Sequence, residues 1–97
     1  MKAAFYDGNN KMEIKEHPDP VPNAGEVLVN IKSTGICGSD LNMNKAKISA
    51  DQDPAGHEVA GEIIDVGKGV NKQVIGKRIA LEVLGSGKSC NTCWFCR

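Results

Sequence analysis

Short stretches in which apolar and polar residues alternate follow one another along most of the chain, and this pattern is typical of β-strands rather than of long helices. The first two stretches are residues 2–6 and 11–16. Between them lies Asp-Gly-Asn-Asn (residues 7–10), a sequence that favours a tight turn. The pattern therefore predicts an antiparallel hairpin at the start of the chain.

Three further strands are expected after a proline-rich loop at residues 17–22, which cannot lie inside a sheet. They cover residues 26–33, 59–66 and 78–83. A glycine-containing break at residues 35–38 ends the first of them. The expected fold is mainly β, a compact and partly open β-barrel.

Only a turn or two of helix is expected. Ser39 or Asp40 is placed to cap a short helix over about residues 41–45, because both residue types accept hydrogen bonds from the first free N–H groups of a helix. Such a helix would follow directly on the break at residues 35–38.

Size and charge limit the classes of function. The chain has 97 residues, enough for one small domain, and its 12 basic and 12 acidic residues balance. This balance provides no basic stripe for nucleic acid or an anionic membrane. The sequence shows neither a secretory signal nor a long apolar run, so a cytoplasmic location is expected.

Three of the four cysteines, Cys90, Cys93 and Cys96, lie three residues apart near Arg97. Thiols at this spacing in a loop can converge on one ion, and zinc takes four such ligands. An iron–sulfur cluster is the main alternative, because the same spacing opens a bacterial ferredoxin pattern. Three unrelated free thiols are the third interpretation. Both metal interpretations need a fourth ligand.

Cys37 and His57 form a second candidate site. One thiolate and one imidazole from two loops suit a catalytic zinc that keeps a position open for substrate. Asp40 is placed to accept the second ring N–H of His57 and so fix its tautomer. The alternative is that Cys37 packs as a small apolar residue and His57 lies on the surface.

These motifs together resemble the zinc-dependent medium-chain alcohol and polyol dehydrogenases, specifically the amino-terminal, GroES-like part of their catalytic domain. Residues 35–40, Gly-Ile-Cys-Gly-Ser-Asp, match the first zinc-ligand loop of that family. Residues 56–61, Gly-His-Glu-Val-Ala-Gly, match its zinc motif, and the three clustered thiols match its structural zinc lobe. The resemblance covers the whole chain and favours zinc over iron–sulfur.

The resemblance implies roles for single residues. Cys37 and His57 would bind a catalytic zinc, with Glu58 beside it and exchanging with water. Ser39 would bind the substrate hydroxyl and start the path of its proton. The zinc would act as a Lewis acid that promotes an alkoxide, and hydride would pass to NAD or NADP. Cys90, Cys93 and Cys96 would bind a structural zinc.

The sequence also departs from the family. Asn42 stands where many relatives have a proton-relay histidine, and an amide cannot act as an acid or base near neutral pH. No G-x-G-x-x-G motif occurs, so the Rossmann cofactor domain is expected to be absent. The third catalytic ligand and the fourth structural cysteine are expected further along a longer chain.

We therefore expect a fragment, residues 1–97 of a GroES-like domain truncated within its structural zinc lobe and inactive alone. The expected partners are a small alcohol, polyol or carbonyl substrate and, in the full-length enzyme, further copies in a dimer or tetramer. The alternative is a free-standing zinc-binding module that uses the GroES-like fold for interaction.

Overall fold

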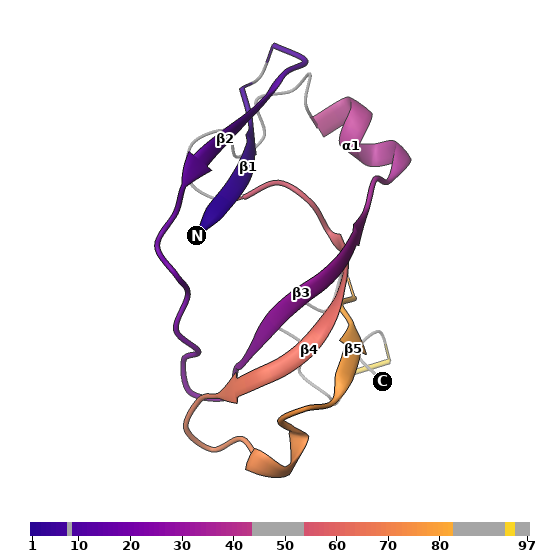
Figure 1. Ribbon diagram of the computed structural model, residues 1–97. Helices are drawn as coiled ribbons and strands as arrows, with labels where there is room; N and C mark the ends of the chain where they lie inside the picture. Colours follow the sequence, from indigo (N-terminus) through magenta and orange to yellow (C-terminus); the bar gives the residue numbers. More distant parts are fainter. Residues whose placement is uncertain (8, 44–53, 83–92, 95–97) are drawn as a thin grey trace. The chain divides into compact units, whose positions relative to one another are not determined.

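A computed structural model of the chain describes residues 1–7, 9–43, 54–82 and 93–94. Strands dominate these ranges (Figure 1). The elements in chain order are β1 (Lys2–Tyr6), β2 (Met12–Glu16), β3 (Val27–Gly35), α1 (Gly38–Met43), β4 (Glu58–Val66), the 3₁₀ turn η1 (Lys72–Val74) and β5 (Arg78–Ala80). The predicted mainly β class is confirmed. Within the described ranges the strands form two sheets and not a closed barrel.

The chain divides into two compact units. The first takes its described residues from 1–20 and 35–57, and the second from 21–34 and 58–94. In the first unit β1 and β2 form the predicted antiparallel hairpin, with Lys2 opposite Glu16 and Tyr6 opposite Met12. The turn is closed by Oδ1 of Asp7, which accepts the backbone N–H groups at positions 9 and 11.

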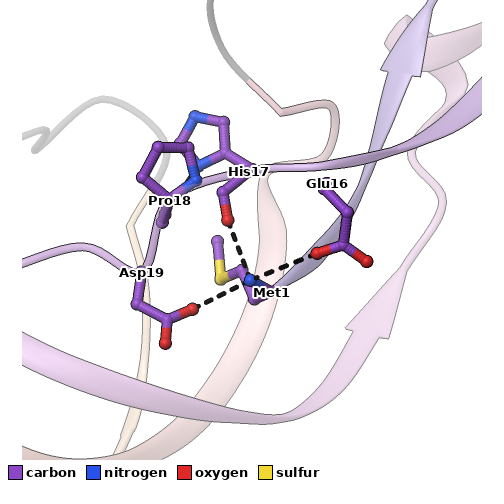
Figure 2. A network of polar contacts seen from close by, with 5 residues as sticks. All are labelled: Met1, Glu16, His17, Pro18 and Asp19. Atoms are coloured by element: carbon purple, nitrogen blue, oxygen red, sulfur yellow. Dashed lines mark hydrogen bonds and ion pairs between the residues drawn. The ribbon is translucent and has the colours of Figure 1, made fainter.

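The open end of the hairpin is held by the amino-terminal ammonium group (Figure 2). Met1 N donates to the carbonyl oxygen of His17 at 2.8 Å and to Oδ1 of Asp19 at 2.9 Å, and it lies 3.7 Å from Oε2 of Glu16. The hydrogen bond to Asp19 is the main cause that raises the pKa of this amine above its usual value. Because these groups are exposed, each ion pair contributes little to stability.

The backbone of β1 also fixes the segment before His57. The N–H of Ala55 donates to the carbonyl oxygen of Ala4 over 2.7 Å. Phe5, between Ala4 and Tyr6, is the buried apolar side chain of this unit in the described ranges, with 5% of its surface exposed. The hydrogen bond of Ala55 therefore ties residues 54–57 to the hairpin.

The second unit contains a three-stranded sheet in the order β3-β4-β5 (Figure 1). β4 and β5 are antiparallel, with Ala60 opposite Ala80 and Glu62 opposite Arg78. Ile63 on β4 is 6% exposed and is the buried apolar side chain described in this unit. Gly61 allows β4 to approach β3 closely, because a Cβ there would overlap the backbone of Asn30.

Two predicted element boundaries differ from the structure by three residues. β5 ends at Ala80 rather than at position 83, although Leu81 N still donates to Val59 O over 2.9 Å; position 83 itself lies outside the described residues. α1 begins at Gly38, three residues before the predicted start. Asp40 does not cap it from outside, since its Oδ2 accepts the N–H of Cys37 at 2.7 Å. This is the reverse half of a capping box, in which the third helical residue reaches back to the N-cap.

The turn η1 was not predicted. Its N-cap is Asn71, whose Oδ1 accepts the N–H of Gln73 over 2.9 Å. Asparagine commonly caps a helical turn in this way. Neither helical element in the described ranges is both long and apolar enough to cross a bilayer.

Candidate metal centre

The first unit brings Cys37 and His57 together. Cys37 immediately precedes α1, and His57 follows the segment that Ala55 anchors to β1. The ligand atoms of the two residues, Sγ and a ring nitrogen, lie within 4.8 Å of each other. Both side chains are half-buried. The predicted proximity of this thiol and imidazole is therefore present in the structure, while their binding of zinc stays a prediction.

Asp40 lies at the centre of the polar contacts around this pair. It is the buried charged residue of the described ranges, with 8% of its surface exposed. Its Oδ1 accepts the phenolic hydroxyl of Tyr6 over 2.6 Å, and its Oδ2 accepts the N–H of Cys37. Both carboxylate oxygens are thus engaged, as a buried charge requires.

Asp40 also lies near the imidazole of His57, while the predicted hydrogen bond that would fix the tautomer of the ring stays a prediction. Its Oδ1 lies 3.5 Å from Nδ1 of His57. That separation is long for a hydrogen bond, so the contact in this structure is an electrostatic one. It places the carboxylate on the Nδ1 side of the ring, which leaves Nε2 on the other side for a different partner.

Ser39 is that partner in the structure. Its Oγ lies 3.2 Å from Nε2 of His57, and its side chain is exposed. The two ring nitrogens therefore face two groups that the sequence analysis named, the carboxylate of Asp40 and the hydroxyl of Ser39. If the proton is on Nδ1, Nε2 can accept a hydrogen bond or bind a metal ion.

The contacts shift three pKa values. Hydrogen bonds from the side chain and backbone of Ser39, and then the proximity of His57, lower the pKa of the Cys37 thiol. The hydroxyl of Tyr6 and the N–H of Cys37 lower the pKa of Asp40. The hydrogen bond to Asp40 raises the pKa of Tyr6 to about 12. A lower thiol pKa favours the thiolate, which is the form that binds metals.

Sequence reasoning missed Tyr6. Tyr6 lies 34 positions from Asp40, and no local motif connects β1 with α1. The available signal was weak: Tyr6 is the single tyrosine of the chain and ends a short strand. A phenol next to a buried carboxylate is a tertiary contact that a strand pattern does not contain.

The structure says less about the other predicted ligands. Glu58 follows His57 directly, is exposed and begins β4 in the second unit. Cys93 is exposed. Cys90 and Cys96 lie outside the described residues, so the predicted structural zinc site stays a prediction.

Comparison with known proteins supplies the family. Residues 23–97 match the alcohol dehydrogenase GroES-like domain. The chain belongs to this family. The resemblance inferred from residues 35–40 and 56–61 is thereby confirmed.

Named relatives cover the whole chain. Sorbitol dehydrogenase from Bacillus subtilis is 37% identical over 102 residues, covering 100% of this chain and 28% of that protein. The zinc-type alcohol dehydrogenase-like protein AdhB of the same organism is 34% identical over 100 residues, covering 100% of this chain and 26% of AdhB.

A solved structure agrees with the fold. The alcohol dehydrogenase rspB from Escherichia coli CFT073, crystallised with NADH, superposes with a TM-score of 0.75 at 37% identity. The superposition covers 99% of this chain and 27% of rspB. The chain thus spans only 26–28% of the length of these relatives.

Proposed function

We propose that this GroES-like chain is the amino-terminal part of a zinc-dependent oxidoreductase that transfers hydride between an alcohol or polyol and NAD or NADP. The observation that carries the proposal is the convergence of Cys37 and His57 within 4.8 Å, with Asp40 and Ser39 on the two sides of the imidazole. Relatives named as sorbitol dehydrogenase and as a zinc-type alcohol dehydrogenase-like protein support it.

The residues present fit zinc. A soft thiolate with a lowered pKa and an imidazole are ligands that zinc prefers over those of calcium or magnesium. Cys37 and His57 would hold the ion, and Glu58, the next residue along the chain, is the third candidate ligand. When bound, the zinc supplies Lewis-acid polarisation of the substrate oxygen, and a nicotinamide cofactor supplies the hydride acceptor.

The remaining steps belong to side chains of this chain. Asp40 attracts the Nδ1 side of His57 and so favours the tautomer whose Nε2 can bind the metal in place of its contact with Ser39. Ser39 is exposed beside Nε2, where its Oγ can accept the proton of the substrate hydroxyl while it gives up its own O–H proton. Asn42, exposed on α1, cannot pass that proton on, so we assign the next transfer to water.

We extend the proposal to the rest of the molecule. Cys90, Cys93 and Cys96 would bind a structural zinc with a fourth cysteine of a longer chain. The location would be the cytoplasm, in line with the zinc-ligating use of these thiols in a reducing compartment. The full-length enzyme would assemble as a dimer or tetramer.

The test is oxidation of a panel of alcohols and polyols by the zinc-loaded full-length protein with NAD or NADP. We expect turnover, and we expect Ser39→Ala to lower kcat by about 10²-fold with zinc content unchanged. Ser33→Ala, on the exposed part of β3, is the matched control and should keep full activity. If the protein bound stoichiometric zinc but turned over no alcohol or polyol, the proposed enzyme function would be wrong. The free-standing zinc-binding module would then be the better interpretation.

A further inference from the structure

We infer that Tyr6 is a positioning residue for the metal centre, acting through Asp40 on Cys37 and His57. The inference rests on the zinc site proposed above and adds to it a residue from outside both ligand-bearing motifs. It rests on one short hydrogen bond and on the direction of the carboxylate group that accepts this bond.

The carboxylate of Asp40 is held at both oxygens. Oδ2 accepts the N–H of Cys37, which ties it to the backbone of one proposed ligand. Oδ1 accepts the hydroxyl of Tyr6 at 2.6 Å and lies 3.5 Å from Nδ1 of His57, the other proposed ligand. With Oδ1 fixed by Tyr6, the carboxylate cannot rotate away from the imidazole without losing a short hydrogen bond to a charged acceptor.

A phenol suits this task. Its O–H donates to Asp40 without bringing a positive charge, so the carboxylate keeps its full charge toward His57. A lysine or arginine in the same place would compete with the imidazole for that charge. Asp40 is 8% exposed, and water has little access to replace the hydroxyl.

The strand β1 contacts both ligand-bearing segments. Through its side chain, Tyr6 contacts Asp40 in α1. Through its backbone, Ala4 accepts the N–H of Ala55, two residues before His57. The same five-residue strand therefore sets the position of the loop that carries Cys37 and of the segment that carries His57.

The test measures the affinity of the full-length protein for Co²⁺ by competition with a chromophoric chelator, together with the visible absorption of the bound ion. For Tyr6→Phe, which removes only the hydroxyl, we expect about a 10-fold loss of affinity and an altered Co²⁺ spectrum. A 10-fold loss is the lower end of what removing a hydrogen-bond partner of a metal ligand costs. Thr34→Val, which removes an exposed hydroxyl from β3, is the control and should match the wild type in both readouts.

Asp40→Ala, which removes the acceptor, completes the experiment. If Tyr6 acts through Asp40, adding Tyr6→Phe to Asp40→Ala changes affinity by less than about 2-fold, since the shared route is already lost. A purely structural role would give the same loss in both backgrounds and would overturn the inference. Wild-type affinity in Tyr6→Phe would overturn it too, leaving the zinc site intact. Failure of the wild type to bind Co²⁺ at Cys37 would instead overturn the proposed function and this inference with it.

Discussion

The hydroxyl of Tyr6 donates to Oδ1 of Asp40 over 2.6 Å and so joins two residues that lie 34 positions apart in the chain. The bond connects the hairpin to α1, from which Asp40 also accepts the N–H of Cys37. It also gives Tyr6 a property that can be measured directly, because the chain contains a single tyrosine.

Tyr6 should ionise with a pKa of about 12, raised first by the hydrogen bond to Asp40 and then by burial and the carboxylate charge. The near-ultraviolet absorbance of the phenolate measures this in an alkaline titration. In Asp40→Asn the midpoint should fall toward the usual value of 10.0. Equal midpoints in both proteins would show that the Tyr6–Asp40 bond is absent in solution.

The same shift affects stability at alkaline pH. A pKa raised in the folded state means that the folded protein holds the proton more tightly than the unfolded chain. This contribution is present below pH 10 and is lost as the pH rises from 10 toward 12. Tyr6→Phe, which cannot ionise, should show a flatter decline of unfolding free energy over that window.

Asp40 should contribute at the acidic end. Its pKa is lowered by the hydroxyl of Tyr6, and next by the N–H of Cys37. The stability it provides is therefore present above the usual value of 3.8 and is lost as the pH falls through its lower folded value. Between about pH 5 and pH 2 the midpoint temperature of thermal unfolding should fall more steeply with decreasing pH in the wild type than in Asp40→Asn.

Asp65→Asn is the control for this measurement. Asp65 lies exposed on β4, and its Oδ1 accepts the backbone N–H of Val66. Its variant should keep the acid dependence of the wild type. If Asp40→Asn also kept the acid dependence of the wild type, Asp40 would not be the group responsible for that dependence.

The strands were predictable because their signal is local. Alternation with period two gave β1 exactly as residues 2–6, and it located β2, β3 and β4 to within a residue or two at each end. β5 is shorter than predicted. Residues 81 and 82 continue the apolar alternation, which favoured a longer strand, but they have no strand structure. The start of α1 was missed because Asp40 can cap a helix from outside or reach back from inside it, and both uses need the same residue type.

The meeting of Cys37 and His57 could be predicted, but the contacts that hold them could not. Both residues stand in motifs that resemble those of the family, and their binding of zinc stays a prediction. The contact of Tyr6 with Asp40 and the bond between Ala55 and Ala4 depend on how distant segments pack. No pattern within one strand or loop contains that information.

Gly61 illustrates a motif residue with a structural reason. A Cβ at this position would overlap the backbone of Asn30 on β3. Gly61→Ala should therefore lower the free energy of unfolding by about 1–3 kcal/mol, as overpacking does. Denaturant unfolding measures this change.

Gly38→Ala provides the comparison, because a Cβ on Gly38 meets nothing within 4 Å. Its free energy of unfolding should differ from the wild type by less than about 1 kcal/mol. If the two alanine variants were equally stable, the close approach of β4 to β3 would not be the reason for a glycine at position 61.

The zinc content of the purified full-length protein, measured by mass spectrometry, tests the central claim most directly. Cys37→Ser and His57→Asn should each lower it by about one equivalent per chain, because removing one ligand from a site of this kind weakens zinc binding strongly, while Ser33→Ala should retain the wild-type content. Cys93→Ser reports separately on the predicted structural site. Wild-type zinc content in both Cys37→Ser and His57→Asn would contradict the account, since Cys37 and His57 would then lie together without forming a metal centre.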